Sequence, residues 1–200
     1  MFQLRPITAE DIPYLVDLWH LAFTGPINER LFPDTPGLRA WGEHFHRSSL
    51  TGPNQRYLKI ISDAESAPPF VAFVKWDLDT ASPNPEHRFP PWHADSDRDF
   101  CDHFFRAMDQ ARKTIMRGRK HYYLDTLATH PDYQRKGAAS MLIQWGCEVA
   151  DREGMPIWVD ASEDGAALYK RFGFQDVSVP GVTPEGASSM LREPVRRDTS

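Results

Sequence analysis

Apolar residues recur along this chain with two periods, which together predict alternating helices and strands. Apolar positions three and four residues apart are typical of helices with one buried face. The helices predicted in this way span Ala9–Phe23, Leu38–Ser49, the region from Phe100 to Ile115, Ala138–Glu153 and Asp164–Arg171. Runs rich in β-branched and aromatic residues predict strands at Phe2–Ile7, Arg56–Asp63, Pro69–Asp79, Tyr122–Thr129, Met155–Ser162, Phe172–Val179 and Ser188–Glu193.

Capping residues and prolines mark where these elements begin and end. Thr8 and Ser96 suit the N-cap position of the first helix and of the helix that contains Phe100. Proline and glycine predict loops at Thr24–Gly37 and Thr80–Asp97. We expect the second loop, about residues 80–97, to be an insertion within one domain of residues 1–200, because neither side would bury a core alone. The tail, about residues 194–200, is predicted to be frayed.

The second half of the chain contains a strand, a helix and a strand in succession, from Tyr122 to Ser162. Such a unit predicts two parallel strands joined by a right-handed crossover. With 200 residues, one mixed α/β domain buries roughly 70% of its unfolded surface.

Composition restricts the classes of function. A net charge of −5 argues against general nucleic-acid binding, which requires a basic face. Two cysteines, Cys101 and Cys147, make no disulfide framework and favour a reducing compartment. The start has no apolar core of signal-peptide length, and no stretch reaches transmembrane length. We therefore expect a protein of the cytoplasm, with the nucleus also compatible, and no membrane partner.

The sequence "QRKGAA" (Gln134–Ala139) stands between a predicted strand and a predicted helix. Glycine and alanine allow close approach to the first amides of the helix, which have no partner within it. These amides, the helix dipole and two cationic side chains suit a phosphate. The ATP-binding pattern G-x-x-x-x-G-K-[ST] and the dinucleotide fingerprint G-x-G-x-x-G are both absent here. The alternative is a helix start whose small residues serve packing.

A second cluster of polar residues, "HADSDRDFCDH" (His93–His103), contains histidines, a cysteine and aspartates. Its spacing matches no paired zinc-ligand pattern, and Cys101 and His103 point in different directions on a helix. A solvated helix start with favourable acidic residues explains it. We expect no metal.

Two linked motifs resemble the GNAT superfamily of acyl-CoA-dependent N-acetyltransferases. "LATHPDYQ" followed by "QRKGAA" is similar to the family's strand end and pyrophosphate loop, and "DASEDGAALYKRFGF" (Asp160–Phe174) is similar to its second signature. The order and spacing agree from Tyr122 to Phe174. Ala139 and Ser162 depart from the common glycine and asparagine. The resemblance implies an α/β (α+β) fold with a mixed, mostly antiparallel central sheet and a parallel β-α-β cofactor unit.

The resemblance also implies a site for acetyl-CoA. Backbone groups on the strand would hold the pantetheine arm and the thioester carbonyl, and the loop amides would hold the pyrophosphate in a cleft between splayed strands. The implied cofactor-binding residues are Leu127, Ala128, Thr129, Gln134, Arg135, Lys136, Gly137, Ala138, Ala139, Ser140 and Ser162.

Catalytic groups follow from the same resemblance and from the chemistry. Tyr169 would protonate the departing thiolate; its alternative is an aromatic residue packed near Phe172 and Phe174. Asp125 is the candidate base, placed by strand alternation on the same face as Leu127 and Thr129. Its alternative is a strand carboxylate satisfied by a nearby cation or by solvent.

Other candidates are weaker. His121 and His130 flank the strand and are either proton relays or surface residues. The segments Phe23–Pro36 and Phe89–His93 either border the acceptor site or are ordinary loops.

The sequence therefore predicts an N-acetyltransferase that moves an acetyl group from acetyl-CoA to a primary amine by direct attack in a ternary complex. The acceptor is a small-molecule or peptide amine, and the chain is a monomer or homodimer. A non-catalytic acyl-CoA sensor on the same fold and a nucleotide-binding protein are the alternatives.

Overall fold

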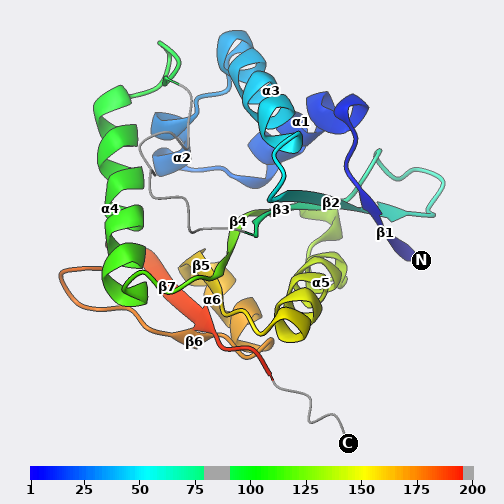
Figure 1. The fold of residues 1–200 in the computed structure, drawn as a ribbon. Coiled ribbons are helices and arrows are strands. Elements are labelled where there is room, and N and C mark those ends of the chain that lie inside the picture. Colours follow the sequence, from blue (N-terminus) through cyan, green and yellow to red (C-terminus); the bar gives the residue numbers. More distant parts are fainter. Residues whose placement is uncertain (79–90, 196–200) are drawn as a thin grey trace, which may run out of the picture.

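In the computed structural model of the chain, residues 1–78 and 91–195 are described, and a mixed sheet runs through them (Figure 1). Its strand order is β1-β2-β3-β4-β5-β7-β6. Only β4 and β5 are parallel; every other neighbouring pair in this described sheet is antiparallel. The mixed, mostly antiparallel architecture is thereby confirmed. The strands are β1 (Phe2–Pro6), β2 (Gln55–Ser62), β3 (Ala72–Asp77), β4 (Tyr122–Thr129), β5 (Ile157–Ser162), β6 (Gln175–Asp176) and β7 (Ala187–Arg192).

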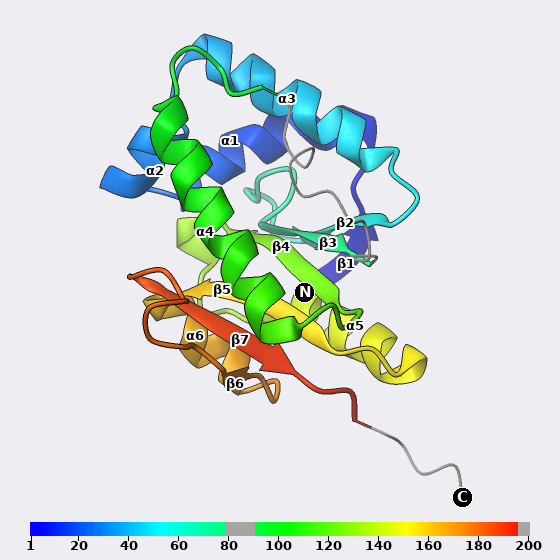
Figure 2. The same cartoon turned by 60° about the vertical axis from the view of Figure 1, so that its left-hand side comes forward.

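Helices cover both faces of this sheet, as Figures 1 and 2 show from two sides. On one face lie α1 (Ile12–Ala22), α2 (Pro26–Leu31), α3 (Pro36–Leu50) and α4 (Arg98–Met116). On the other face lie α5 (Ala138–Glu153) and α6 (Glu163–Lys170). Short 3₁₀ turns precede α1 (Ala9–Asp11) and α5 (Pro131–Tyr133). None of the helices in the described part of the chain has the length and apolarity needed to cross a membrane.

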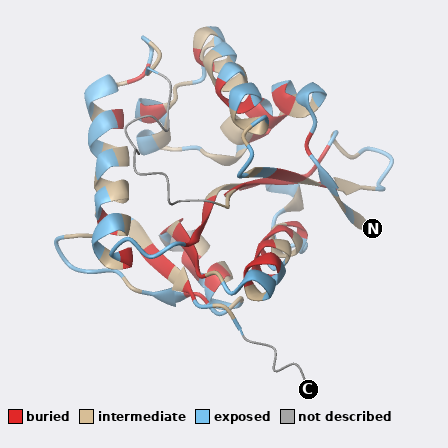
Figure 3. Cartoon of the chain, in the orientation of Figure 1, coloured by how far each residue is buried: buried red, intermediate tan, exposed pale blue. Residues whose placement is uncertain are grey.

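The core is divided between the two faces of the sheet (Figure 3). Ile12, Leu15 and Leu18 of α1 pack against Phe70 and Phe73 on one side. On the other side α5 approaches β3 so closely that a Cβ atom on Gly146 would lie 2.1 Å from the Trp76 ring. Glycine is required there because any side chain would displace the buried indole.

The β-α-β unit has the predicted bounds for its first strand and its helix, and β5 begins two residues later than expected. The loop predicted at Thr24–Gly37 is wrong in part, because α2 lies within it and α3 begins at Pro36. Gly25 stands at the N-cap of α2 with φ +104° and Pro26 occupies its first turn. Proline is favoured at helix starts, so these residues begin a helix here.

Two further boundaries differ from the sequence prediction. The cap of α4 is Asp97, whose carboxylate accepts a hydrogen bond from the amide of Phe100 at 3.1 Å, while Ser96 is buried beside it. The strand predicted at Phe172–Val179 contains only β6, since Gly173 has φ +85° and turns the chain before it. The predicted insertion lies largely outside the described residues, and residues 91–97 form neither helix nor strand.

Candidate active site

A cavity of about 980 Å³ lies where β4 and β5 part. These strands pair only through Tyr122 with Ile157 and Tyr123 with Trp158. The lining residues come from α1 to α4 on one face of the sheet, and from the turn before α5 and from α6 on the other. The cavity therefore extends to both faces of the sheet. The part of it that lies between the splayed strands β4 and β5 is its waist.

The turn before α5 forms one end of the cavity. Gly137 is the N-cap of this helix, with φ +97°. Apart from its chain neighbours and the backbone of its own helix, no atom of the described residues lies within 4 Å of the position that a Cβ atom would take there. Arg135 also has positive φ, at 57°. The resulting loop exposes the first helical amides, which together with the helix dipole suit an anion. The residues of this turn that line the cavity are Gln134, Arg135, Gly137, Ala138, Ala139 and Ser140.

Lys136 is the predicted cofactor residue that stands apart from this lining. Its ammonium nitrogen lies 5.1 Å from the centroid of the Tyr133 ring, a cation–π contact on the exposed side of the loop. Lys136 therefore contributes positive charge near the loop and does not line the cavity.

The second half of β4 supplies a backbone edge to the cavity. Leu127, Ala128 and Thr129 line it and pair on their other edge with β3. Since β5 has parted from β4 by this point, the free edge of β4 faces the cavity. Backbone donors and acceptors on such an edge are available to an extended ligand.

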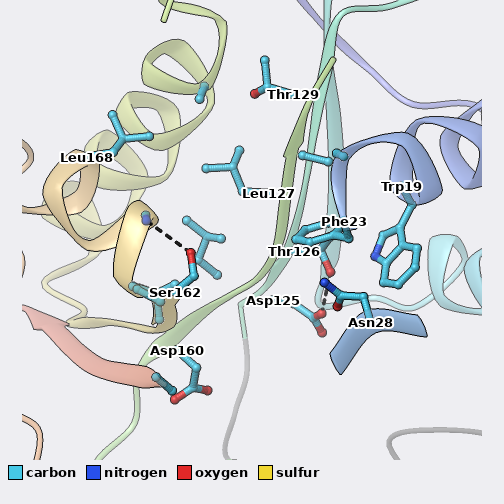
Figure 4. A pocket seen from close by; sticks show the side chains of 18 of the residues that line it. Trp19, Phe23, Asn28, Asp125, Thr126, Leu127, Thr129, Asp160, Ser162 and Leu168 are labelled. Atoms are coloured by element: carbon cyan, nitrogen blue, oxygen red, sulfur yellow. Dashed lines mark hydrogen bonds between the residues drawn. The ribbon is translucent and has the colours of Figure 1, made fainter. Parts of the chain in front are cut away.

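Ser162 ends β5 and caps α6. Its hydroxyl oxygen accepts a hydrogen bond from the amide of Gly165 at 3.2 Å, and the residue lines the cavity (Figure 4). The hydroxyl thus holds the helix start in place beside the waist.

Tyr169 lies on α6 and also lines the cavity. It is buried, with its ring centroid 5.5 Å from that of Phe174. Burial raises the pKa of the phenol above its ordinary value of about 10, so the hydroxyl keeps its proton at neutral pH. The residue combines the packing role considered above with a protonated oxygen at the cavity.

A β-bulge in β4 changes the position expected for Asp125. Lys75 of β3 pairs with Thr126, whereas the next residue, Trp76, pairs with Leu124, so Asp125 is the extra residue. Alternation is interrupted there. Leu124 and Leu127 both contact the core beneath α5, and Asp125 lies on the opposite side, by Asn28 of α2 (Figure 4). The prediction that Asp125 shares a face with Leu127 and Thr129 is therefore wrong.

The carboxylate of Asp125 is held by a buried cation. Lys75 Nζ lies 3.1 Å from Asp125 Oδ2, and the two side chains are 4% and 11% exposed. Asp125 Oδ1 also accepts a hydrogen bond from the Thr126 hydroxyl at 2.9 Å. The ammonium group lies 4.5 Å from the centroid of the Phe45 ring. This geometry supports the alternative of a carboxylate satisfied by a nearby cation, and it places Asp125 on the lining of the cavity.

His46 on α3 is a buried neighbour of this pair that sequence reasoning missed. Burial lowers its pKa to about 3, the charge of Lys75 acts in the same direction, and Asp125 opposes them. Its Nδ1 lies 3.1 Å from the Tyr57 hydroxyl. A signal for this cluster was present, because Lys75 interrupts the apolar run "PFVAFVKW" and a buried lysine requires partners.

The other sequence candidates lie away from the cavity lining. The Nδ1 of His121 donates to the carbonyl of Arg119 at 2.7 Å, and burial lowers its pKa to about 4. The Nδ1 of His130 accepts a hydrogen bond from the amide of Asp132 at 3.3 Å. Cys101 is buried on α4. Within residues 1–78 and 91–195, no group of three or more histidine, cysteine, aspartate or glutamate side chains is placed to hold a metal ion.

Aromatic side chains form the end of the cavity opposite the loop before α5. They include Trp19 of α1, Phe23 at the C-cap of α1, Phe32 after α2, and Trp41 of α3. Part of the predicted segment Phe23–Pro36 therefore borders the cavity. Of Phe89–His93, residues 89 and 90 lie outside the described residues, and the carbonyl of Pro91 accepts a hydrogen bond from Trp41 Nε1 at 2.9 Å.

The fold with its split parallel strands is that of the acyl-CoA N-acyltransferases. The family model described as "Acetyltransferase (GNAT) family" matches residues 85–174, which confirms the resemblance that the two motifs indicated. The match supports acyltransferase activity, with acetyl transfer to amines as its general form.

Solved structures share this fold at low identity. A histone acetyltransferase HPA2 and related acetyltransferase from Corynebacterium glutamicum is 20% identical, with a TM-score of 0.64 and 98% of each chain covered. Arylalkylamine N-acetyltransferase 2 from Aedes aegypti is 14% identical, with a TM-score of 0.67 and coverage of 96% and 98%. The PaiA N-acetyltransferase from Thermoplasma acidophilum, solved with coenzyme A, is 10% identical, with a TM-score of 0.56 and coverage of 96% and 99%.

Proposed function

We propose that this protein transfers an acetyl group from acetyl-CoA to a primary amine by direct attack in a ternary complex. The observation that carries the proposal is the cavity that passes through the sheet, with an anion-binding helix start at one end and an aromatic chamber at the other. Two substrates entering from opposite faces would meet at the waist between β4 and β5.

Acetyl-CoA would enter from the α5 side. The pyrophosphate would rest on the amides from Arg135 to Ser140, and the pantetheine arm would extend along Leu127, Ala128 and Thr129 on the open edge of β4. A backbone amide on this edge would donate to the acetyl oxygen as negative charge develops on it. Ser162 would act indirectly, because its hydroxyl caps α6 and so helps to position this helix beside the bound cofactor.

The reaction forms one bond and breaks one. The neutral amine nitrogen attacks the acetyl carbonyl carbon, a tetrahedral oxyanion forms, and the C–S bond then breaks to give an amide and the thiolate of coenzyme A. One proton leaves the amine and one reaches the thiolate. Tyr169 is the proposed donor to the thiolate, because its buried phenol remains protonated.

Asp125 is the proposed receiver of the proton that the amine loses. Its ion pair with Lys75 favours the charged form, which is ready to accept a proton but is a weak base. We therefore expect the transfer to run through a water molecule between the acceptor and the carboxylate.

A covalent acyl-cysteine route finds little support. Cys101 and Cys147 are buried and lie outside the cavity lining, and burial raises the pKa of each thiol to about 11. Neither is available as a thiolate at neutral pH. This favours direct attack by the amine.

The test is thiol release from acetyl-CoA by the purified chain with a panel of primary amines, beside calorimetry with coenzyme A. Direct attack predicts amine-dependent release with intersecting initial-velocity lines. Parallel lines would indicate an acyl-enzyme and contradict the ternary complex. Tight binding of coenzyme A without turnover of any amine would favour the sensor, and affinity for ATP without affinity for coenzyme A would favour the nucleotide-binding protein.

A further inference from the structure

We infer that the acceptor is an arylalkylamine, a primary amine joined through a short alkyl arm to an aromatic ring. The inference rests on the proposed function and narrows the acceptor to one chemical class. Two observations carry it. Aromatic rings line the cavity on the side of α1 to α4, and most carboxylates that line the cavity already have partners within the protein.

Tryptophan and phenylalanine rings form a continuous wall of the chamber. The Trp19 and Phe32 rings meet edge to face at 5.1 Å between centroids. Phe32 stacks on Trp41 at 5.8 Å, and Trp41 stacks on Phe45 at 5.7 Å. Trp19, Phe32 and Trp41 are only half-buried although they lie among other rings, and all of them line the cavity. An aromatic ligand would extend this arrangement, because rings pair favourably at such separations.

Helix α4 adds further apolar side chains to the aromatic end of the cavity. Phe104, Phe105 and Met108 line the cavity, and the Phe105 ring lies 6.1 Å from that of Phe32. Helix α4 is joined to α2 by the ion pair of Asp97 with Arg30 and by the hydrogen bond from the amide of Asp97 to the carbonyl of Arg30 at 3.1 Å. Helix α4, which carries this part of the wall, is thus in direct contact with α2.

The carboxylates that line the cavity suit one ammonium group rather than several. Asp125 is paired with Lys75, and Asp160 accepts hydrogen bonds from the Tyr123 hydroxyl at 3.1 Å and from Trp158 Nε1 at 2.9 Å. Glu185 is the other acidic residue among the described residues of the lining. A polyamine or an amino sugar with several cationic groups would find few counter-charges here. A single ammonium would be stabilised by the faces of the aromatic rings.

The first experiment compares two primary amines that differ by a ring. We expect kcat/KM for 2-phenylethylamine to exceed that for n-butylamine by at least about tenfold, because the ring leaves water and contacts the wall. Spermidine should be acetylated less efficiently than 2-phenylethylamine. A preference for spermidine, or equal rates for the first two amines, would overturn the inference.

The second experiment removes one ring from the wall. Trp41→Ala should lower kcat/KM for 2-phenylethylamine at least about tenfold, and by more than it lowers kcat/KM for n-butylamine. Trp41→Phe keeps an aromatic ring and should retain most of the preference. Trp145→Ala is the matched control, since Trp145 is a half-buried indole on α5 outside the cavity lining. Equal losses for both amines, or the same selective loss in the Trp145 variant, would speak against the chamber.

A binding measurement separates this inference from the proposed function. Calorimetry of the protein loaded with coenzyme A should show tighter binding of 2-phenylethylamine than of n-butylamine, and Trp41→Ala should abolish the difference. If no amine is acetylated but this binding pattern holds, acetyl transfer is wrong and the aromatic amine site stands. If amines are acetylated without ring preference in rate or binding, acetyl transfer stands and the arylalkylamine assignment is wrong.

Discussion

Lys75 of β3 and Asp125 of β4 face each other at a β-bulge, with 3.1 Å between Nζ and Oδ2 and almost no access to solvent. The bulge aims the carboxylate at the face covered by α1 to α4, where the proposed acceptor would bind. A buried pair of this kind leaves an uncompensated charge when one partner is removed, so each partner has a structural role as well as a chemical one.

Removing the negative partner should therefore destabilise the fold. We expect Asp125→Asn to lower the free energy of unfolding by about 3 kcal/mol, and Lys75→Met in the same chain to restore a large part of it. Urea denaturation of the single and double variants measures both. The exposed ion pair of Arg119 with Glu193 is the control: Glu193→Gln should cost less than about 1 kcal/mol. Additive losses in the double variant would contradict the coupling.

The same variants test the chemical role of Asp125. If Asp125 receives the proton of the amine, kcat stays low in the double variant after stability has recovered, and the acidic limb of the pH–rate profile changes in shape. Recovery of kcat together with stability would limit Asp125 to a positioning role.

Gly137 should be essential for binding of coenzyme A. Its φ of +97° is unfavourable for residues with a branched Cβ, and the space beside it is where the pyrophosphate would approach. We expect Gly137→Val to weaken the affinity for coenzyme A at least about tenfold, or about 1.4 kcal/mol. The matched control is Gly154→Val at the other end of α5, where φ is +67° and the surroundings are also open. That variant should lose stability and keep its affinity; equal affinity losses would remove the loop from the site.

Tyr169→Phe removes one oxygen and keeps the ring against Phe174. If the phenol protonates the thiolate, kcat should fall by about 10² to 10⁴-fold with little change in affinity for coenzyme A. Because burial raises the pKa of Tyr169 above its ordinary value of about 10, ionisation of this group should lower the wild-type rate only at a pH above that value. Tyr14→Phe, outside the cavity lining, controls for loss of a phenol. An unchanged kcat in the Tyr169 variant would make this tyrosine structural.

His46 should make stability depend on pH. Its pKa is about 3 in the native state, from burial first and the charge of Lys75 second, against an ordinary value of 6.5. Between these values the unfolded chain binds a proton that the native state does not. Stability is therefore complete above pH 6.5 and falls as the pH is lowered, by about 2 kcal/mol at pH 5 from this group.

The measurement is the free energy of unfolding at pH 7 and pH 5. His46→Gln should reduce the difference between the two pH values. His44→Gln changes an exposed histidine on the same helix and should leave the difference unchanged. The same difference in the His46 variant and in the wild type would show that this histidine is not the responsible group.

Local patterns in the sequence predicted the cofactor half of the fold well, because a strand, a glycine turn and an amphipathic helix are encoded by neighbouring residues. The bounds of β4 and α5 follow from such signals. The face of Asp125 could not be predicted in this way, since a bulge depends on how β3 pairs with β4 and leaves no trace in the alternation.

The acceptor side was harder to predict for a related reason. The apolar stripe of the helix predicted at Ala9–Phe23 runs from Leu15 through Trp19 to Phe23, and periodicity assigns all of it to the core. The first turns are buried, whereas Trp19 and Phe23 border the cavity. Hydrophobic spacing does not distinguish a side chain that packs against the protein from one that packs against a ligand.

The passage of the cavity through the sheet also divides the two recognition tasks along the chain. The loop and helix proposed to hold the cofactor lie after residue 126, whereas most of the aromatic wall comes from the first 45 residues. Exchange of α1, α2 and α3 between relatives would thus alter which amine is preferred as acceptor. The loop before α5, where coenzyme A is proposed to bind, would stay intact. In such a chain, diversification of acceptors can proceed by recombination of one contiguous segment.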